Sequence, residues 1–192
     1  MRLWTARVIS AFSHPVVVFP ASVPFFAFQV DLAREQVFSL IPALFVLAIP
    51  LLYFLYALRR KKISDWEVTE RRERYVLYFL SLLCGGLGLW LLQPFGSRSL
   101  ITVALIFYLL GIFVTLINFA WKISAHAAGI TTGALTFNLL LGQSPLFYFL
   151  IPLVVWGRYV EQKHTPAQLL AGVILGVAVV FGVLTIRGGP VF

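Results

Sequence analysis

Charged residues and cysteine are both scarce in this sequence. Only 11% of the 192 residues are charged, and a single cysteine, Cys84, lies inside an apolar run. One cysteine excludes a disulfide framework within the chain and a metal site built from cysteines. Because a typical soluble domain carries about 25% charged residues, the composition argues against a soluble globular protein.

Apolar residues take the place of the missing charge. They make up 60% of the sequence, and the mean hydropathy is +0.94. We therefore expect an all-α protein, a single domain over residues 1–192 that forms a polytopic transmembrane helix bundle of about seven spans. The apolar runs place these spans at roughly residues 10–30, 37–58, 75–92, 99–119, 124–141, 145–160 and 166–186.

Two parts of this assignment are less regular than the rest. The first span contains Pro15 and lacks a clear small-residue cleavage site, so we interpret it as a retained span and not as a signal peptide. The two spans between His126 and Arg158 are short, which leaves open two crossings, one re-entrant hairpin or one long tilted helix. The Gly142-Gln143-Ser144-Pro145 sequence favours a turn there.

The basic residues are unevenly distributed between the two expected sides. The net charge is +8, but seven of the fifteen Lys and Arg residues fall in residues 59–74 between apolar spans, which is typical of a membrane-topology signal and not of a nucleic-acid partner. Seven crossings place twelve basic residues on the side of the N-terminus, against Arg34, Arg98 and Arg187 on the other. This excess predicts a protein of the cytoplasmic membrane whose basic side faces the cytoplasm.

Residues with the chemistry to act on phosphate gather on the basic side. His126 opens the fifth span, and His164 precedes the seventh. An imidazole is a good nucleophile and, near neutral pH, a good proton donor, so two histidines can divide one reaction between them. Arg158 offers a planar fork for phosphoryl oxygens, and Ser124 with nearby backbone amides adds donors at a helix start. We expect His14, beside Pro15, to be structural.

The pattern around His164 resembles the third motif of the type 2 phosphatidic acid phosphatase superfamily. That motif is Ser-Arg, five residues, His, three residues, Asp, and this chain has Gly157-Arg158, five residues, His164, three residues, Gln168. Arg and His match in spacing, while the flanking Ser and Asp are replaced. In the family the Asp orients the nucleophilic His, so the resemblance gives this role to Gln168 or, three residues before His164, to Glu161.

The other two motifs are matched in part, and the resemblance extends from about Lys62 to Gly176. The second motif, Pro-Ser-Gly-His, corresponds to residues 123–126 and keeps Ser124 and His126. For the first motif, Lys62 and one of Arg71, Arg72 and Arg74 are the candidates. The resemblance implies a six-helix core and a reaction without metal or cofactor, in which His164 attacks phosphorus and His126 protonates the leaving oxygen. Arg158, Lys62 and Arg71 or Arg72 would hold the phosphate.

These residues predict an integral membrane phosphatase for a lipid phosphate or diphosphate, either a prenyl diphosphate or a phosphatidate-like lipid. The expected partners are this lipid phosphate substrate and the membrane lipids, and a homo-oligomer or a larger membrane assembly stays open. The alternative is a catalytically weak or inactive lipid-phosphate binder or small membrane subunit, suggested by the incomplete first motif and by Gln168. A transporter is less favoured because no span carries a mid-membrane charge.

Overall fold

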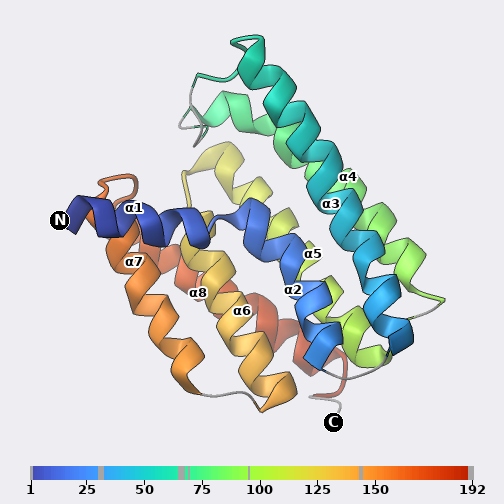
Figure 1. Cartoon of the computed structure of the whole chain (residues 1–192). Helices are drawn as coiled ribbons and strands as arrows, with labels where there is room; N and C mark the ends of the chain where they lie inside the picture. The colour runs from blue at the N-terminus through green and yellow to red at the C-terminus, as the bar shows by residue number, and fades with distance from the viewer. Residues whose placement is uncertain are drawn as a thin grey trace.

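A computed structural model describes residues 2–29, 33–64, 68, 70–94, 96–142 and 145–189 of the chain. Within these ranges every regular element is helical, which confirms the all-α expectation (Figure 1). Three helices, α4, α5 and α8, are long and apolar enough to cross a membrane. The elements are α1 (Arg2–Phe12), α2 (Pro15–Gln29), α3 (Ala33–Arg59), η1 (Arg71–Glu73), α4 (Arg74–Leu92), α5 (Arg98–Ala120), α6 (Ala125–Leu141), η2 (Pro145–Phe149), α7 (Leu150–Val160) and α8 (Pro166–Ile186).

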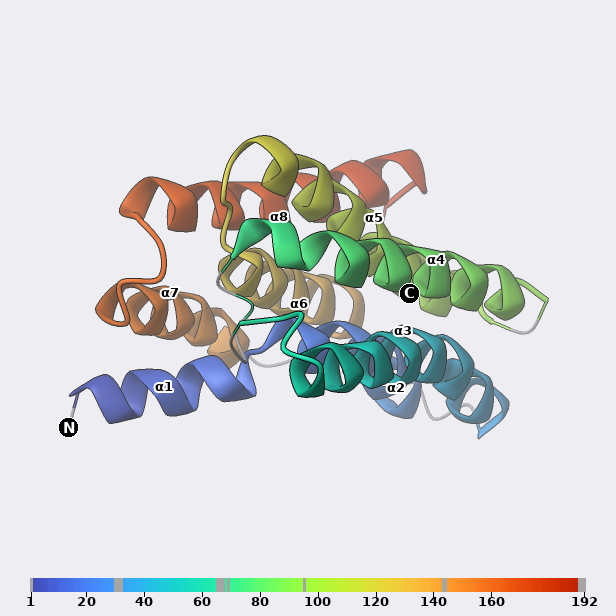
Figure 2. The same ribbon diagram turned by 90° about the horizontal axis from the view of Figure 1, so that it is seen from above.

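The expected first span, residues 10–30, is wrong as a single helix. Helix α1 ends at Phe12, and α2 begins at Pro15. Proline has no N–H to continue a helix and disfavours helical backbone at the residue before it, whereas it is well tolerated as a first helical residue. The break places the α1–α2 junction beside the start of α6, and α1 packs against α7 (Figure 2).

The chain turns back on itself after α6. Gly142 caps this helix with a left-handed backbone, at a φ of 57°, and Pro145 then opens η2. Glycine adopts this conformation without the steric cost that a Cβ would bring. Helices α6 and α7 pack side by side, so one long helix through this segment is excluded (Figure 1). Residues 143 and 144 of the expected turn lie outside the described ranges.

Two glycines hold α8 closely against α6. A Cβ added at Gly172 would lie 2.7 Å from the carbonyl oxygen of Ser124, and one at Gly176 would lie 2.8 Å from that of Ala128. Such distances are shorter than real Cβ contacts, so only glycine permits this approach. Small residues permit this kind of close packing between apolar helices. The contact fixes the start of α6 relative to the start of α8.

The bundle has two chemically different ends. At one end α6 and α8 begin and α7 ends; we call it the histidine end, and its defining residues are His14, His126, Arg158, Glu161 and His164. At the other end α5 begins and α8 ends; we call it the arginine end, defined by Arg98, Thr102 and Arg187. Between them, the core is formed by apolar side chains of α2, α5, α6 and α8, among them Leu110 and Val180.

Candidate functional site

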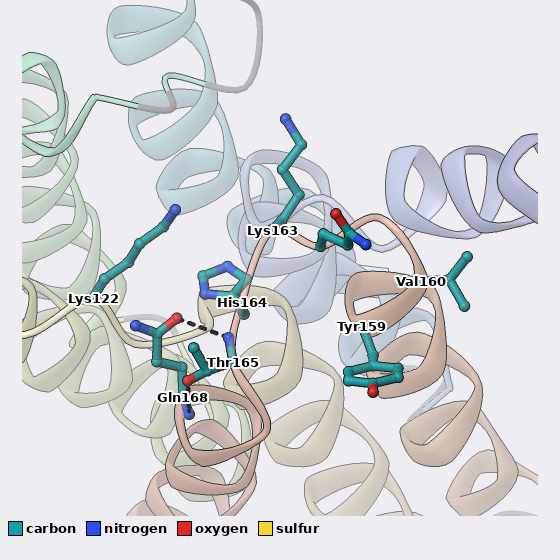
Figure 3. Close-up of a pocket in the computed structure, with 8 residues that line it drawn as sticks. Lys122, Tyr159, Val160, Lys163, His164, Thr165 and Gln168 are labelled. Atoms are coloured by element: carbon teal, nitrogen blue, oxygen red, sulfur yellow. Dashed lines mark hydrogen bonds between the residues drawn. The ribbon is translucent and has the colours of Figure 1, made fainter.

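His164 lies in the short connection between α7 and α8. The connection is fixed by a capping box: Thr165 Oγ1 accepts from the Gln168 N–H at 3.3 Å, and Gln168 Oε1 accepts from the Thr165 N–H at 3.1 Å (Figure 3). Pro166 follows as the first residue of α8, a position where its missing N–H costs nothing. These local preferences end α7 and restart the chain within a few residues, and thereby hold His164 beside the start of α8.

His126 is positioned by the capped start of α6. The Ser124 hydroxyl accepts from the Ala127 N–H at 3.3 Å, and the Ser124 N–H donates to the Gln168 carbonyl at 3.3 Å, which joins the starts of α6 and α8. His126 follows in the first turn and is buried; its ring donates a hydrogen bond to the main-chain carbonyl of Ser10. Nε2 of His126 is enclosed and has no hydrogen-bond partner among the described residues.

Arg158 forms a buried ion pair at the end of α7. Its Nη1 donates to Glu161 Oε2 at 2.9 Å, and the two side chains are only 5% and 4% exposed. The same carboxylate oxygen accepts from the Ser10 hydroxyl at 2.6 Å. Charges this deeply buried are retained in proteins when they are paired and hydrogen-bonded, as they are here.

These groups form one electrostatic cluster. Arg158 interacts electrostatically with both His126 and His164, and the two histidines interact with each other. The ring of His14 packs edge-on against that of His126, with centroids 5.3 Å apart and an interplanar angle of 88°. The three residues singled out by the second and third motifs are therefore brought together, and His14 joins them from the α1–α2 junction.

The environment of His164 keeps its imidazole neutral. Burial is the main cause that lowers the pKa of His164 to about 3, and the positive charges of Arg158, Lys122 and Arg74 lower it further. A hydrogen bond with the Gln168 side chain acts in the opposite direction. At physiological pH the ring therefore has a free lone pair, which is the form that acts as a nucleophile.

His164 also lines an open pocket of about 550 Å³ (Figure 3). The pocket brings together the imidazole and two lysines, which suits an anionic group. Arg158 and His126 are buried and lie outside its lining. The lining residues are Lys122, Tyr159, Val160, Gln162, Lys163, His164, Thr165 and Gln168.

The remaining predicted residues lie in other surroundings. Lys62 is exposed, with its Nζ 5.4 Å from the centre of the Tyr56 ring, and Arg72 is also exposed. The side chain of Arg71 lies outside the described part of the chain. Glu161 contacts Arg158 and Ser10, as described above.

Of the three arginines that are first-motif candidates, Arg74 interacts electrostatically with His164, and its Nε donates to the Val68 carbonyl at 2.6 Å. Two further residues of the site carried no motif signal. Lys122 lines the pocket, and Ser10 contacts Glu161 from the N-terminal helix. The only sequence indication for Lys122 was its place on the basic side, and Ser10 had none.

No family model, no curated protein and no solved structure matches this chain. Among the described residues, no group of three or more His, Cys, Asp or Glu side chains is arranged to hold a metal ion.

Proposed function

We propose that this chain is an integral membrane phosphatase for a lipid phosphate or diphosphate, similar in mechanism to the type 2 phosphatidic acid phosphatases. The observation that carries the proposal is the convergence of His126, Arg158 and His164 from separate segments, with a neutral His164 at a lysine-lined pocket. A neutral imidazole beside several cations is the arrangement that histidine attack on a phosphoryl group requires.

The reaction divides between the two histidines. A His164 ring nitrogen attacks phosphorus, the P–O bond to the lipid breaks, and the leaving oxygen takes a proton delivered through the His126 ring. Water then attacks phosphorus, the P–N bond breaks, inorganic phosphate leaves, and the proton lost by water returns to His126. Gln168 hydrogen-bonds the nucleophile, in the position where the family has Asp.

Several positive groups support the anion in this proposal. Lys122 and Lys163 line the pocket, and Arg74 lies within electrostatic range of His164. The N-termini of α6 and α8 meet at the Ser124–Gln168 hydrogen bond, so the positive ends of both helix dipoles lie at the histidine end. Among the three candidates for the first-motif arginine, the electrostatic interaction with His164 supports Arg74.

In the membrane, α2 to α8 would each cross once, with α1 at the surface. The histidine end carries the loops rich in Lys and Arg, which supports a cytoplasmic site in the cytoplasmic membrane. The exposed apolar side chains of α1, Leu3, Trp4 and Phe12, suit the lipid interface.

Phosphate release from prenyl diphosphate and phosphatidate in mixed micelles tests the proposal. We expect the purified protein to release inorganic phosphate in the presence of EDTA, and His164→Ala to lower turnover by about 10³-fold or more. Thr185→Ala, at an exposed position near the far end of α8, serves as the control and should keep full turnover. Full turnover in His164→Ala would refute the mechanism.

A lipid-phosphate binder without turnover is the second candidate. Two observations favour this candidate. Glu161 already neutralises the charge of Arg158, and His126 is not among the residues that line the pocket. In that case the protein binds inorganic phosphate or orthovanadate and Lys122→Gln weakens this binding, while neither lipid substrate is hydrolysed. Measurable hydrolysis that depends on His164 would exclude this candidate.

A further inference from the structure

The N-terminal helix supplies a polar contact to the histidine end that the motifs do not include. Ser10, in the last turn of α1, is 4% exposed and contacts both halves of the cluster. Its hydroxyl donates to Glu161 Oε2 at 2.6 Å, and its main-chain carbonyl accepts from the His126 ring. One residue thus contacts the histidine of the second motif and the carboxylate that holds the arginine of the third.

The contact with Glu161 affects Arg158 directly. Glu161 Oε2 accepts from the Ser10 hydroxyl and from Arg158 Nη1, at 2.6 and 2.9 Å. A buried carboxylate whose oxygen accepts from two donors in different helices has little freedom to rotate. Rotation away from either donor would break a charge-assisted hydrogen bond. The orientation of the Arg158 guanidinium therefore depends on a hydroxyl from α1.

The packing of α1 holds Ser10 in this place. A Cβ at Gly157, the residue before Arg158, would lie 3.5 Å from the Ala6 carbonyl oxygen and 3.5 Å from Ile9 Cγ2. Helix α1 packs against α7 beside the ion pair, so closely that a side chain at Gly157 would reach it. The edge-on packing of His14 against His126 adds a second contact just after α1 ends.

We propose that Ser10 is a positioning residue of the phosphate site, which orients Arg158 through Glu161 and His126 through its main-chain carbonyl. Helix α1 then positions residues of the site and is not only a surface anchor. The inference rests on the proposed function, since it takes the anion at the histidine end to be a phosphoryl group.

Orthovanadate binding by the full-length protein in detergent tests this role. Ser10→Ala should raise the dissociation constant about 3- to 10-fold, the size expected when part of one charge-assisted hydrogen bond is lost, and Ser10→Thr should restore it to within about 2-fold. In a Glu161→Gln background the same Ser10→Ala change should add less than about 2-fold, because the two residues act through one contact. An additive effect in that background would overturn the proposal.

The matched control is Thr5→Ala. Thr5 also lies on α1 and also carries a hydroxyl, but its side chain is exposed. We expect this variant to bind orthovanadate as the wild type does. A loss of affinity equal to that of Ser10→Ala would mean that any damage to α1 weakens the site, and would overturn a specific role for Ser10.

Histidine resonances separate this inference from the proposed function. The chain has only three histidines, so a protein labelled with ¹⁵N-histidine gives three assignable ring systems. We expect Ser10→Ala to shift the signals of His126 and His164, and Thr5→Ala to leave them in place. If the wild type binds no oxyanion, the proposed function fails, but these signals still decide whether Ser10 organises the cluster. Unchanged signals in Ser10→Ala would refute the inference.

Discussion

The histidine end and the arginine end of the bundle use similar polar groups in opposite ways. At the arginine end, Arg98 donates to the Arg187 carbonyl, and Arg187 donates to Thr102 Oγ1 at 3.2 Å and to the Arg98 carbonyl at 3.4 Å. At the histidine end, Arg158 is paired with a buried carboxylate, while His126 Nε2 and His164 Nδ1 are enclosed without a hydrogen-bond partner among the described residues.

This difference distinguishes a structural contact from a candidate site. The two arginines at the arginine end join the start of α5 to the end of α8, and their observed hydrogen bonds account for their presence. A buried polar atom without a partner costs about 1–3 kcal/mol, so a cluster that contains two such nitrogens is expensive for stability alone. The proposed function would explain this cost at the histidine end, whereas the hydrogen bonds described at the arginine end leave no such cost to explain.

The largest expected effect is on the two buried charges. Arg158→Met leaves Glu161 buried without its cation and should lower the free energy of unfolding by about 3–5 kcal/mol. Arg187→Met removes only hydrogen bonds to a carbonyl and a hydroxyl and should cost about 1 kcal/mol. Unfolding in mixed micelles titrated with SDS measures both. The double variant Arg158→Met/Glu161→Gln should recover most of the loss; equal costs for the two arginines would remove the difference between the ends.

The next effect concerns the contact that places α6 and α8 together. In Gly172→Ala the new methyl would lie 2.7 Å from the Ser124 carbonyl oxygen, and such overpacking should cost about 1–3 kcal/mol. Gly182→Ala, on the same helix, meets nothing within 4 Å and should be neutral or stabilising by up to about 1 kcal/mol. The same SDS titration checks the pair. If Gly172→Ala is as stable as Gly182→Ala, the close contact does not determine the geometry of the site.

Protonation of His164 gives the histidine end a pH-dependent stability. The pKa of His164 is lowered to about 3, against an ordinary value of 6.5. Between pH 3 and pH 6.5, His164 is therefore protonated in the unfolded chain and neutral in the folded protein. The free energy of unfolding should therefore fall as pH drops below about 6.5, by about 2 kcal/mol at pH 5 from this residue. His164→Asn should flatten this dependence relative to the wild type. Parallel curves for the two proteins would contradict the pKa shift.

The smallest effect compares one helix cap at each end. Thr165 caps α8 at the histidine end, and Ser97 caps α5 at the arginine end, where its side chain accepts from the Leu100 N–H at 3.1 Å. Thr165→Ala and Ser97→Ala should each cost about 1 kcal/mol of stability. Only Thr165→Ala should also change phosphate release, because its loop carries His164. Equal turnover in the two variants would show that the loop position does not matter.

The sequence predicted the helices well because their signal is local. Long apolar runs bounded by charged or turn-forming residues gave the helices from α3 to α8 to within a few residues, and the Gly142–Pro145 segment marked the reversal after α6. The first span failed because apolar runs flank Ser13 and His14 on both sides and suggested one continuous helix, whereas the backbone cannot continue the helix into Pro15.

The candidate site was predicted only where its residues have fixed spacing. Arg158 and His164 lie on either side of one short loop, and His126 follows a recognisable helix cap, so their positions carry information in the sequence. Ser10 and His14 reach the cluster through packing of distant segments, which no local pattern records. The sequence also suggested a phosphate-binding role for Lys62, as a candidate for the first motif. In the structure its side chain lies over the Tyr56 ring instead.

Trapping of the phosphorylated protein tests directly whether His164 attacks phosphorus. Wild-type protein is mixed with a lipid phosphate labelled with ³²P and quenched in alkali within the first turnover, since phosphohistidine is stable in base and labile in acid. We expect label on the peptide that contains His164. The label should be absent from His164→Ala and present in Ser97→Ala. Release of labelled phosphate by the wild type without label at His164, or with equal label in His164→Ala, would contradict this mechanism.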